Sequence, residues 1–180
     1  MTDWALIVFA TSEAAIPLAA LRDALLAEGA PANLGVDIAG EATDEQLSDP
    51  DWEAALLRWL EPEVHEVALI ERLNAAEDEI EPLIETHRRK IAESSDVAGR
   101  MIVADYLART KAVYTVQILP ALIAEDGHDA WGALDELLRV LARAADGLIY
   151  VEAEGYCDAD GELLLAEADE LNTVDVEDLD

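Results

Sequence analysis

The stretch Trp4-Ala-Leu-Ile-Val-Phe-Ala10 and the residues that follow it as far as Gly29 decide the fold class of this chain. A continuous apolar run of this length is typical of a β-strand that is buried on both faces. Thr11 and Ser12 can then cap a helix, which Gly29 ends because glycine readily adopts the backbone conformation that follows a last helical turn. The apolar stripe of this helix is expected to consist of Ala14, Leu18, Leu21 and Leu25. The pattern therefore predicts a buried strand followed by an amphipathic helix.

Strands and helices continue to alternate along the rest of the chain. Leu34, Val36 and Ile38 alternate with small or polar residues, which predicts a second strand and completes a β-α-β unit. Further strands are predicted at 64–72, 113–119 and 148–154, and further helices at 50–60, 75–93, 96–109 and 129–145. The turn signal Asp160-Gly161 between two apolar runs predicts a closing β-hairpin. The fold class predicted is α+β, with a mixed sheet of about four to six strands and helices packed on it.

Two of the predicted helices carry tryptophan. The first follows Asp49-Pro50, which suits an N-cap and a first helical position. Its expected buried face consists of Trp52, Leu56, Trp59 and Leu60, and that of the helix at 129–145 consists of Trp131, Leu134, Leu138 and Leu141. Core packing is the favoured role of these rings, although tryptophan is also enriched at interface hot spots. Trp52, which follows an acidic loop, is the candidate for a partner contact.

The length of 180 residues suits a single α+β domain, which we expect to cover residues 1–166. A division into two halves of β-α-β type, 1–62 and 63–166, stays open as an alternative. Residues 167–180 are acidic and poor in large apolar side chains. We therefore expect this last segment to be a flexible tail.

The strongest compositional signal is charge, because 41 acidic residues face 11 basic ones and give a formal net charge of −30. A globular chain of this length is roughly 40 Å across. Duplex DNA of that length carries about two dozen phosphate charges. The chain thus carries a net charge similar to that of the nucleic acid it would span. Direct binding to nucleic acid and to an anionic lipid surface is therefore not expected, whereas a basic protein is the expected partner.

Other features of the composition bear on fold and compartment. An apolar fraction of 52% provides enough side chains for a core, unlike that of disordered acidic chains. The sequence has no apolar run close to the ~20 residues that a membrane helix needs, and its first residues lack the basic region of a secretory signal. The single cysteine, Cys157, cannot form an internal disulfide. The expected location is cytoplasmic.

Metal-binding patterns are weak. Tyr156, Asp158, Asp160, Gly161 and Glu167 fall at positions 1, 3, 5, 6 and 12 of an EF-hand loop. Tyrosine replaces the carboxylate at the first position, however, and the flanking residues indicate strands, so a hairpin turn is the favoured interpretation. The three histidines, His65, His87 and His128, are more than twenty residues apart and show no zinc-type spacing. No metal and no cofactor are predicted.

Catalytic patterns are absent as well. The serines fall at expected helix caps or breaks, and none lies in a nucleophile elbow. Cys157 precedes an acidic turn, which should raise the pKa of its thiol and reduce its reactivity. Six of the eleven cations lie within residues 88–111, where we expect them to pair with neighbouring acids rather than bind an anion. No catalytic residue is predicted.

Three functions are compatible with these observations. The favoured one is a non-enzymatic acidic interaction protein that masks a basic partner, as an inhibitor, an immunity protein or a DNA mimic does. The expected contact residues are Asp44, Glu45, Asp51 and Trp52 in the first half of the chain and Glu152, Glu154, Asp158 and Asp160 in the second. One alternative is a domain whose acidity serves only solvation or adaptation to salt. The other is an enzyme whose site is assembled from scattered residues, which would require a pocket with shifted pKa values.

Overall fold

The structure is a computed structural model that describes residues 5–13, 16–36, 42–61, 63–74, 80–124 and 128–167. Its strands are β1 (Ala5–Ala10), β2 (Ala32–Gly35), β3 (Ala54–Trp59), β4 (His65–Asn74), β5 (Ala112–Ile118), β6 (Gly147–Val151), β7 (Gly155–Cys157) and β8 (Leu163–Ala166). Its helices are α1 (Leu18–Ala27), α2 (Asp44–Ser48), α3 (Ile80–Ala92), α4 (Val97–Arg109), α5 (Pro120–Ile123) and α6 (His128–Ala145). The fold is therefore α+β, as predicted.

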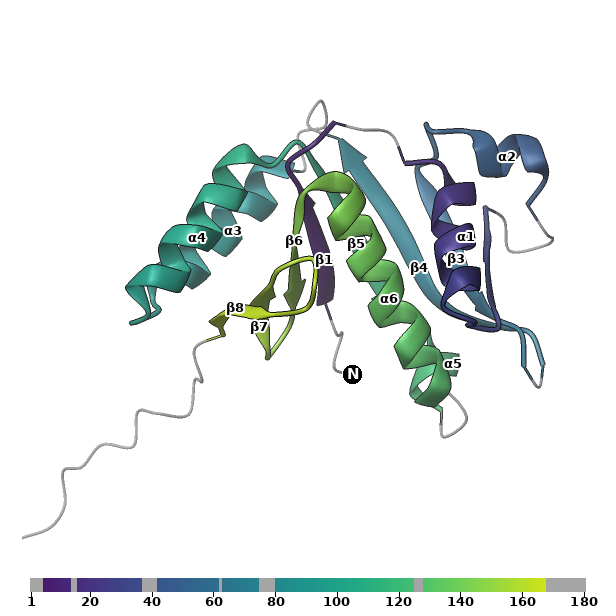
Figure 1. Cartoon of the computed structure of the whole chain (residues 1–180). Helices are drawn as coiled ribbons and strands as arrows, with labels where there is room; N and C mark the ends of the chain where they lie inside the picture. Colours follow the sequence, from purple (N-terminus) through teal and green to yellow (C-terminus); the bar gives the residue numbers. More distant parts are fainter. Residues whose placement is uncertain are drawn as a thin grey trace, which may run out of the picture.

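The eight strands form one sheet in the order β2-β3-β4-β5-β1-β6-β7-β8, with helices on both sides of it (Figure 1). Every pair of neighbouring strands is antiparallel. The predictions of a mixed sheet and of four to six strands are therefore wrong. β1 and β2 do not form a compact β-α-β unit, because β5, β4 and β3 lie between them. An alternation of strands and helices along the sequence does not say which strands become neighbours.

The predicted helix at 50–60 is also wrong, because most of this segment is strand β3, which pairs with β2 and β4. Leu56 and Leu57 are consecutive and both buried. That is the pattern of a strand covered on both faces. A short apolar run of this kind fits a buried helix equally well, and only the neighbouring strands decide between the two.

The central strand β1 is confirmed as a strand buried on both faces. Val8 belongs to the core between the sheet and the layer of α1, α2, α5 and α6, whereas Phe9 belongs to the core under α3 and α4. Both side chains are fully buried. The sheet thus separates two apolar cores, and β1, which pairs with β5 and β6, contributes to each.

The helical predictions are largely confirmed, with shifted ends. α1 begins at Leu18 after Pro17 rather than after Ser12, and its residues Leu18, Leu21 and Leu25 are buried as expected. Gly29 has a φ of +77°, which suits its position after the last turn. The predicted stripe residue Ala14, like Trp4 and Ile38, lies outside the described residues.

At the end of the chain, β7 and β8 are antiparallel neighbours joined by residues 158–162. The predicted tail lies outside the described residues, except for Glu167. The division into two halves stays untested, and strands from both proposed halves belong to the same sheet. In the part of the chain that the structure describes, no helix combines the length and apolar character needed to cross a membrane.

Candidate functional site

The acidic residues predicted to contact a partner lie in two groups at opposite ends of the sheet order. Asp44 and Glu45 are exposed in the first turn of α2, and Asp51 is exposed just before β3, the neighbour of the edge strand β2. α2 lies at the same end of the molecule as β3 (Figure 1). The second group, Glu152, Glu154, Asp158 and Asp160, lies in the turns on either side of β7, near the β8 edge. The structure therefore does not bring the predicted residues together on one surface.

In the first group, α2 is held by a capping box. The Thr43 side chain accepts a hydrogen bond from the backbone N–H of Gln46, and the Gln46 side chain accepts one from the backbone N–H of Thr43. Asp44 and Glu45 follow the cap, where the helix dipole favours negative charge. Among the described residues, neither carboxylate is within ion-pair distance of a cation. Both therefore contribute unpaired surface charge.

Trp52, predicted as the aromatic partner contact of this group, lies in the core. Its side chain is only 6% exposed, and its indole Nε1–H donates a 2.6 Å hydrogen bond to the carbonyl of Ile16. Its ring packs against Tyr114 at a centroid distance of 5.8 Å. Trp52 therefore cannot provide an exposed aromatic contact beside Asp44, Glu45 and Asp51.

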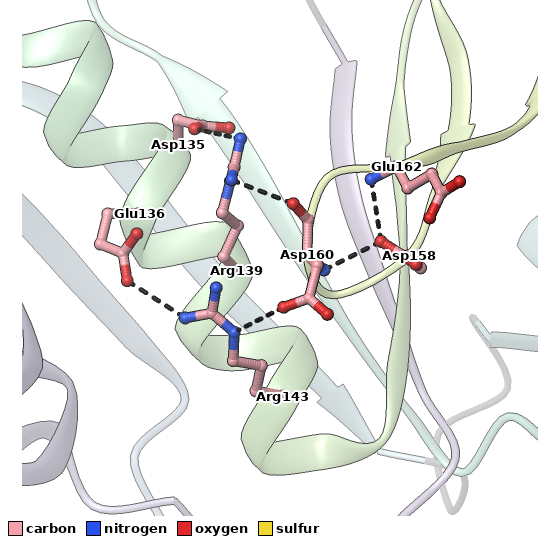
Figure 2. A network of polar contacts seen from close by, with 7 residues as sticks. All are labelled: Asp135, Glu136, Arg139, Arg143, Asp158, Asp160 and Glu162. Atoms are coloured by element: carbon pink, nitrogen blue, oxygen red, sulfur yellow. Dashed lines mark hydrogen bonds and ion pairs between the residues drawn. The ribbon is translucent and has the colours of Figure 1, made fainter.

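In the second group, Asp158 and Asp160 fix their own loop (Figure 2). Asp158 Oδ1 accepts hydrogen bonds from the backbone N–H groups of Asp160 and Glu162. Arg139 donates to the carbonyl of Asp160 at 3.0 Å, and Arg143 donates to the Asp160 carboxylate at 3.3 Å. These contacts attach the loop to α6. No group of acidic, histidine or cysteine side chains that could hold a metal occurs among the described residues.

Glu154 has a different environment, because it lies at an apolar hollow of about 360 Å³. The hollow is lined by Leu6, Ile118, Ile123, Trp131, Val151 and Glu154. Three of these residues come from the neighbouring strands β5, β1 and β6, and two come from α5 and α6. α5 lies beside the first turns of α6 at this end of the sheet (Figure 1). Among the described residues that line it, none is a cation.

The helical geometry explains why this hollow stays open. In α5, Leu122 is buried in the core, so its neighbour Ile123, about 100° further round the helix axis, points outward and is 61% exposed. In α6, Ala130 and Leu134 are buried, and Trp131 between them is 36% exposed. The prediction that Trp131 is buried is therefore wrong. The result is an exposed aromatic ring and an exposed isoleucine next to a carboxylate.

A second hollow of about 380 Å³ lies over β3 and β4. It is lined by Val36, Ala54, Ala55, Leu56, Glu66, Leu69 and Leu119. Its carboxylate, Glu66, already pairs with the buried Arg58 at 3.4 Å, and no aromatic ring lines it. This hollow therefore suits a cationic side chain of a partner less well than the hollow at Trp131 does.

The structure also contains a partly buried polar cluster that sequence reasoning missed. His87 of α3 is 2% exposed, and its Nδ1 lies 2.7 Å from the hydroxyl of Tyr156. Lys90 donates to the Tyr150 hydroxyl at 2.6 Å and pairs with Glu167 at 2.7 Å. Only the spacing of three along α3 links His87 and Lys90 in the sequence. Tyr150 comes from β6, Tyr156 from β7, and Glu167 directly follows β8.

This cluster shifts the pKa values of its members. Burial, reinforced by the charge of Lys90, lowers the pKa of His87 to about 4. Burial alone would raise the pKa of Glu167, but hydrogen bonds from Lys90, the Ala153 N–H and Tyr150 outweigh it and lower that pKa. Each side chain satisfies another, and none lines either hollow described above. The cluster therefore suits a structural role, in which it attaches Glu167 to α3.

The raised pKa expected for Cys157 is confirmed, and the ion pairing expected for the cations of residues 88–111 is confirmed for four of the six. The pKa of the Cys157 thiol is raised, chiefly by burial and further by Glu154 and Asp158. Within residues 88–111, four cations pair with carboxylates, namely Arg88, Lys90, Arg109 and Lys111. Arg89 and Arg100 contact neutral oxygens instead.

Comparison with known proteins adds no functional information. No protein-family model matches the chain, and neither a curated protein nor a solved structure matches it.

Proposed function

We propose that this chain is a non-enzymatic acidic interaction protein that masks a basic site on a partner protein, as an inhibitor, an immunity protein or a DNA mimic does. The observation that carries the proposal is the hollow that combines the exposed rings and methyl groups of Trp131 and Ile123 with the carboxylate of Glu154. It lies on a chain with a net charge of −30. The contact is with protein rather than nucleic acid or membrane, and the cytoplasm is the expected compartment.

The chemistry of this hollow suits a lysine or arginine side chain of a partner. Such a side chain has an apolar stem and a cationic head. The stem can cover the apolar lining, while the head lies near the Trp131 ring, where a cation–π contact is worth about 0.5–2 kcal/mol, and near the Glu154 carboxylate. At longer range, the negative field of the chain accelerates the approach of a basic protein.

The distribution of charge supports a second function for most of the acids. Acidic residues lie near both edges of the sheet, for example Asp44 on α2 and Glu162 in the loop before β8. Acids spread in this way suit general solvation of the surface. A DNA mimic would instead be expected to gather its acids on one face. We therefore assign recognition to the hollow and solvation to the remaining acids.

The third function, catalysis, receives less support. The groups with shifted pKa values, such as His87 and Tyr156, are buried and bonded to each other, and they do not line the hollow at Trp131. A catalytic site requires such groups to face a substrate. This separation favours binding over chemistry.

The test is capture of partners by the immobilised chain from a lysate of its source, at ~0.05 M and ~0.5 M salt, followed by mass spectrometry. We expect a basic protein that is retained at low salt and weakened at high salt. The purified partner is then titrated against two single variants with the same change of charge, Glu154→Arg and Asp44→Arg. Glu154→Arg should weaken binding at least ~30-fold and Asp44→Arg less than ~5-fold, since only the first places a cation at the contact.

Three outcomes contradict the proposal. Retention of only abundant, heterogeneous basic proteins assigns all of the acidity to solvation. Equal losses from Glu154→Arg and Asp44→Arg, which change the charge by the same amount, assign recognition to net charge rather than to the hollow. A loss of binding that occurs only when Asp44, Glu45 and Asp51 are reversed together assigns the partner contact to the β2 edge.

A further inference from the structure

The two long helices on the other side of the sheet differ in charge from the rest of the chain. The hairpin of α3 and α4, residues 80–109, contains five cations and five acids, so the whole net charge of −30 lies outside it. The outer side of α4 is also apolar, with Met101 68% exposed, Val97 55% exposed and Ile102 46% exposed. An exposed apolar stripe on a neutral helix pair indicates a surface that another segment covers.

A groove of about 350 Å³ lies between the two helices. It is lined by Arg88, Ile91, Ala92, Arg100, Met101 and Ala104. Arg100 donates to the backbone carbonyls of Ala92 and Ser94, and no carboxylate among the described residues is within ion-pair distance of it. Arg88 pairs with the exposed carboxylates of Glu81 and Glu85. The groove thus has an apolar floor and guanidinium groups beside it.

Residues 168–180 have the complementary composition. They read Ala-Asp-Glu-Leu-Asn-Thr-Val-Asp-Val-Glu-Asp-Leu-Asp, with six acids, four large aliphatic residues and no cation. A segment of this kind is repelled by most of the surface of residues 1–167, which carry 35 acids against 11 cations and so a net charge of −24. The neutral hairpin, with Arg88 and Arg100 at its groove, is the surface that repels it least.

The start of this segment is attached next to the groove. The Glu167 carboxylate pairs with Lys90 at 2.7 Å and accepts a 2.6 Å hydrogen bond from the backbone N–H of Ala153. Lys90 directly precedes Ile91, which lines the groove. Thirteen further residues can span up to about 43 Å when extended, so the segment can reach every lining residue.

We propose that the groove between α3 and α4 is a docking site for the chain's own residues 168–180. The aliphatic residues of the segment cover the floor at Ile91 and Met101, and its carboxylates lie near Arg88 and Arg100. This site is distinct from the hollow at Trp131, and it has the opposite preference in charge. The proposal that residues 168–180 dock in the groove can therefore fail or succeed independently of the proposed partner site at Trp131.

The experiment uses the full chain, with a nitroxide spin label on Val176→Cys in a Cys157→Ser background. Broadening of backbone amide signals in ¹⁵N NMR spectra then reports which residues the segment approaches. We expect strong broadening at Ala92, Arg100 and Met101, and little on α1 and α6. Raising the salt from ~0.05 M to ~0.5 M should reduce the broadening severalfold, because the contact is partly electrostatic.

Matched variants sharpen the result. Arg100→Glu should remove most of the broadening at the groove, whereas Arg22→Glu, the same change of charge on α1, should retain it. Met101→Glu is a second groove variant at a side chain too exposed to support the fold. Broadening that is confined to residues near Glu167, or that survives both groove variants, overturns the proposal.

A mixed sample tests whether the segment docks on its own chain. Unlabelled ¹⁵N chain is combined with spin-labelled chain that carries no ¹⁵N. Broadening of the groove signals in this mixture means that the segment binds a second copy, which overturns docking within one chain. Undisturbed signals in the mixture, together with broadening in the singly labelled chain, support it.

Discussion

Trp52 and Trp131 both have carboxylates beside them, but the structure uses the two rings in opposite ways. Trp52 directly follows Asp51, yet its ring is 6% exposed and its N–H is bonded to the carbonyl of Ile16. Trp131 is 36% exposed and lines a hollow with Glu154, which lies 23 positions away along the chain. The ring next to an acid in the sequence, Trp52, is therefore buried. The ring that meets an acid only in the folded structure, Trp131, is exposed.

The difference shows what a binding site on an acidic chain requires. Unpaired acids such as Asp44 and Glu45 supply charge, which steers a partner but gives little affinity by itself. An apolar anchor beside a carboxylate adds desolvated contact area. Among the hollows described above, only the one at Trp131 combines an exposed aromatic ring with a carboxylate.

The largest effect expected from this comparison is on stability. Trp52→Ala should lower the free energy of unfolding by about 3–5 kcal/mol, because it leaves a cavity and removes a hydrogen bond in the core. Trp131→Ala should cost only about 1–2 kcal/mol, because water can fill the open hollow. Urea denaturation of the two variants measures both values. Equal losses would mean that the two rings are not differently packed, and the comparison would fail.

A second prediction contrasts the open hollow with the closed cluster at His87. The pKa of His87 is about 4 in the folded chain and 6.5 is its ordinary value, so the unfolded chain binds more protons between these pH values. Stability due to this residue is therefore present above pH 6.5 and is lost as the pH falls towards 4. The loss is about 3 kcal/mol when complete.

The measurement is urea denaturation at several pH values, compared with that of His87→Gln. The variant should lack this loss between pH 6.5 and 4, while the effects of all the carboxylates remain common to both chains. The same substitution at the exposed His65, His65→Gln, provides the matched control for the change of residue type. A His87→Gln curve parallel to that of the unchanged chain would disprove the closed environment.

The smallest effect separates the acids that build structure from those that only carry charge. Asp158→Ala removes the acceptor of two backbone N–H groups and should cost about 1–2 kcal/mol. Asp44→Ala removes only a favourable charge near the start of the short helix α2 and should cost less than about 0.5 kcal/mol. Thermal unfolding of both variants gives the comparison. A cost for Asp44→Ala as large as that for Asp158→Ala would remove the distinction.

Elements with a complete local pattern were predictable. The helices at 80–92 and 97–109 were expected because an apolar periodicity is interrupted at Ser94-Ser95, and Asp96 caps the second one by accepting a hydrogen bond from the N–H of Gly99. β3 was mistaken for a helix because its apolar run suits either structure. The candidate site was only partly predictable. Glu154 was named, but the exposure of Trp131 and Ile123 depends on strands and helices that lie far away in the sequence.

The net charge, the apolar positions of most helices and the buried character of β1 can be derived from the sequence alone, because they follow from residue types and short-range periodicity. The tertiary structure alone decided the order of the eight strands, the burial of Trp52 and the meeting of Trp131 with Glu154. The physical reason is that strand pairing and helix packing join residues of distant sequence position. No local pattern specifies which of them will meet.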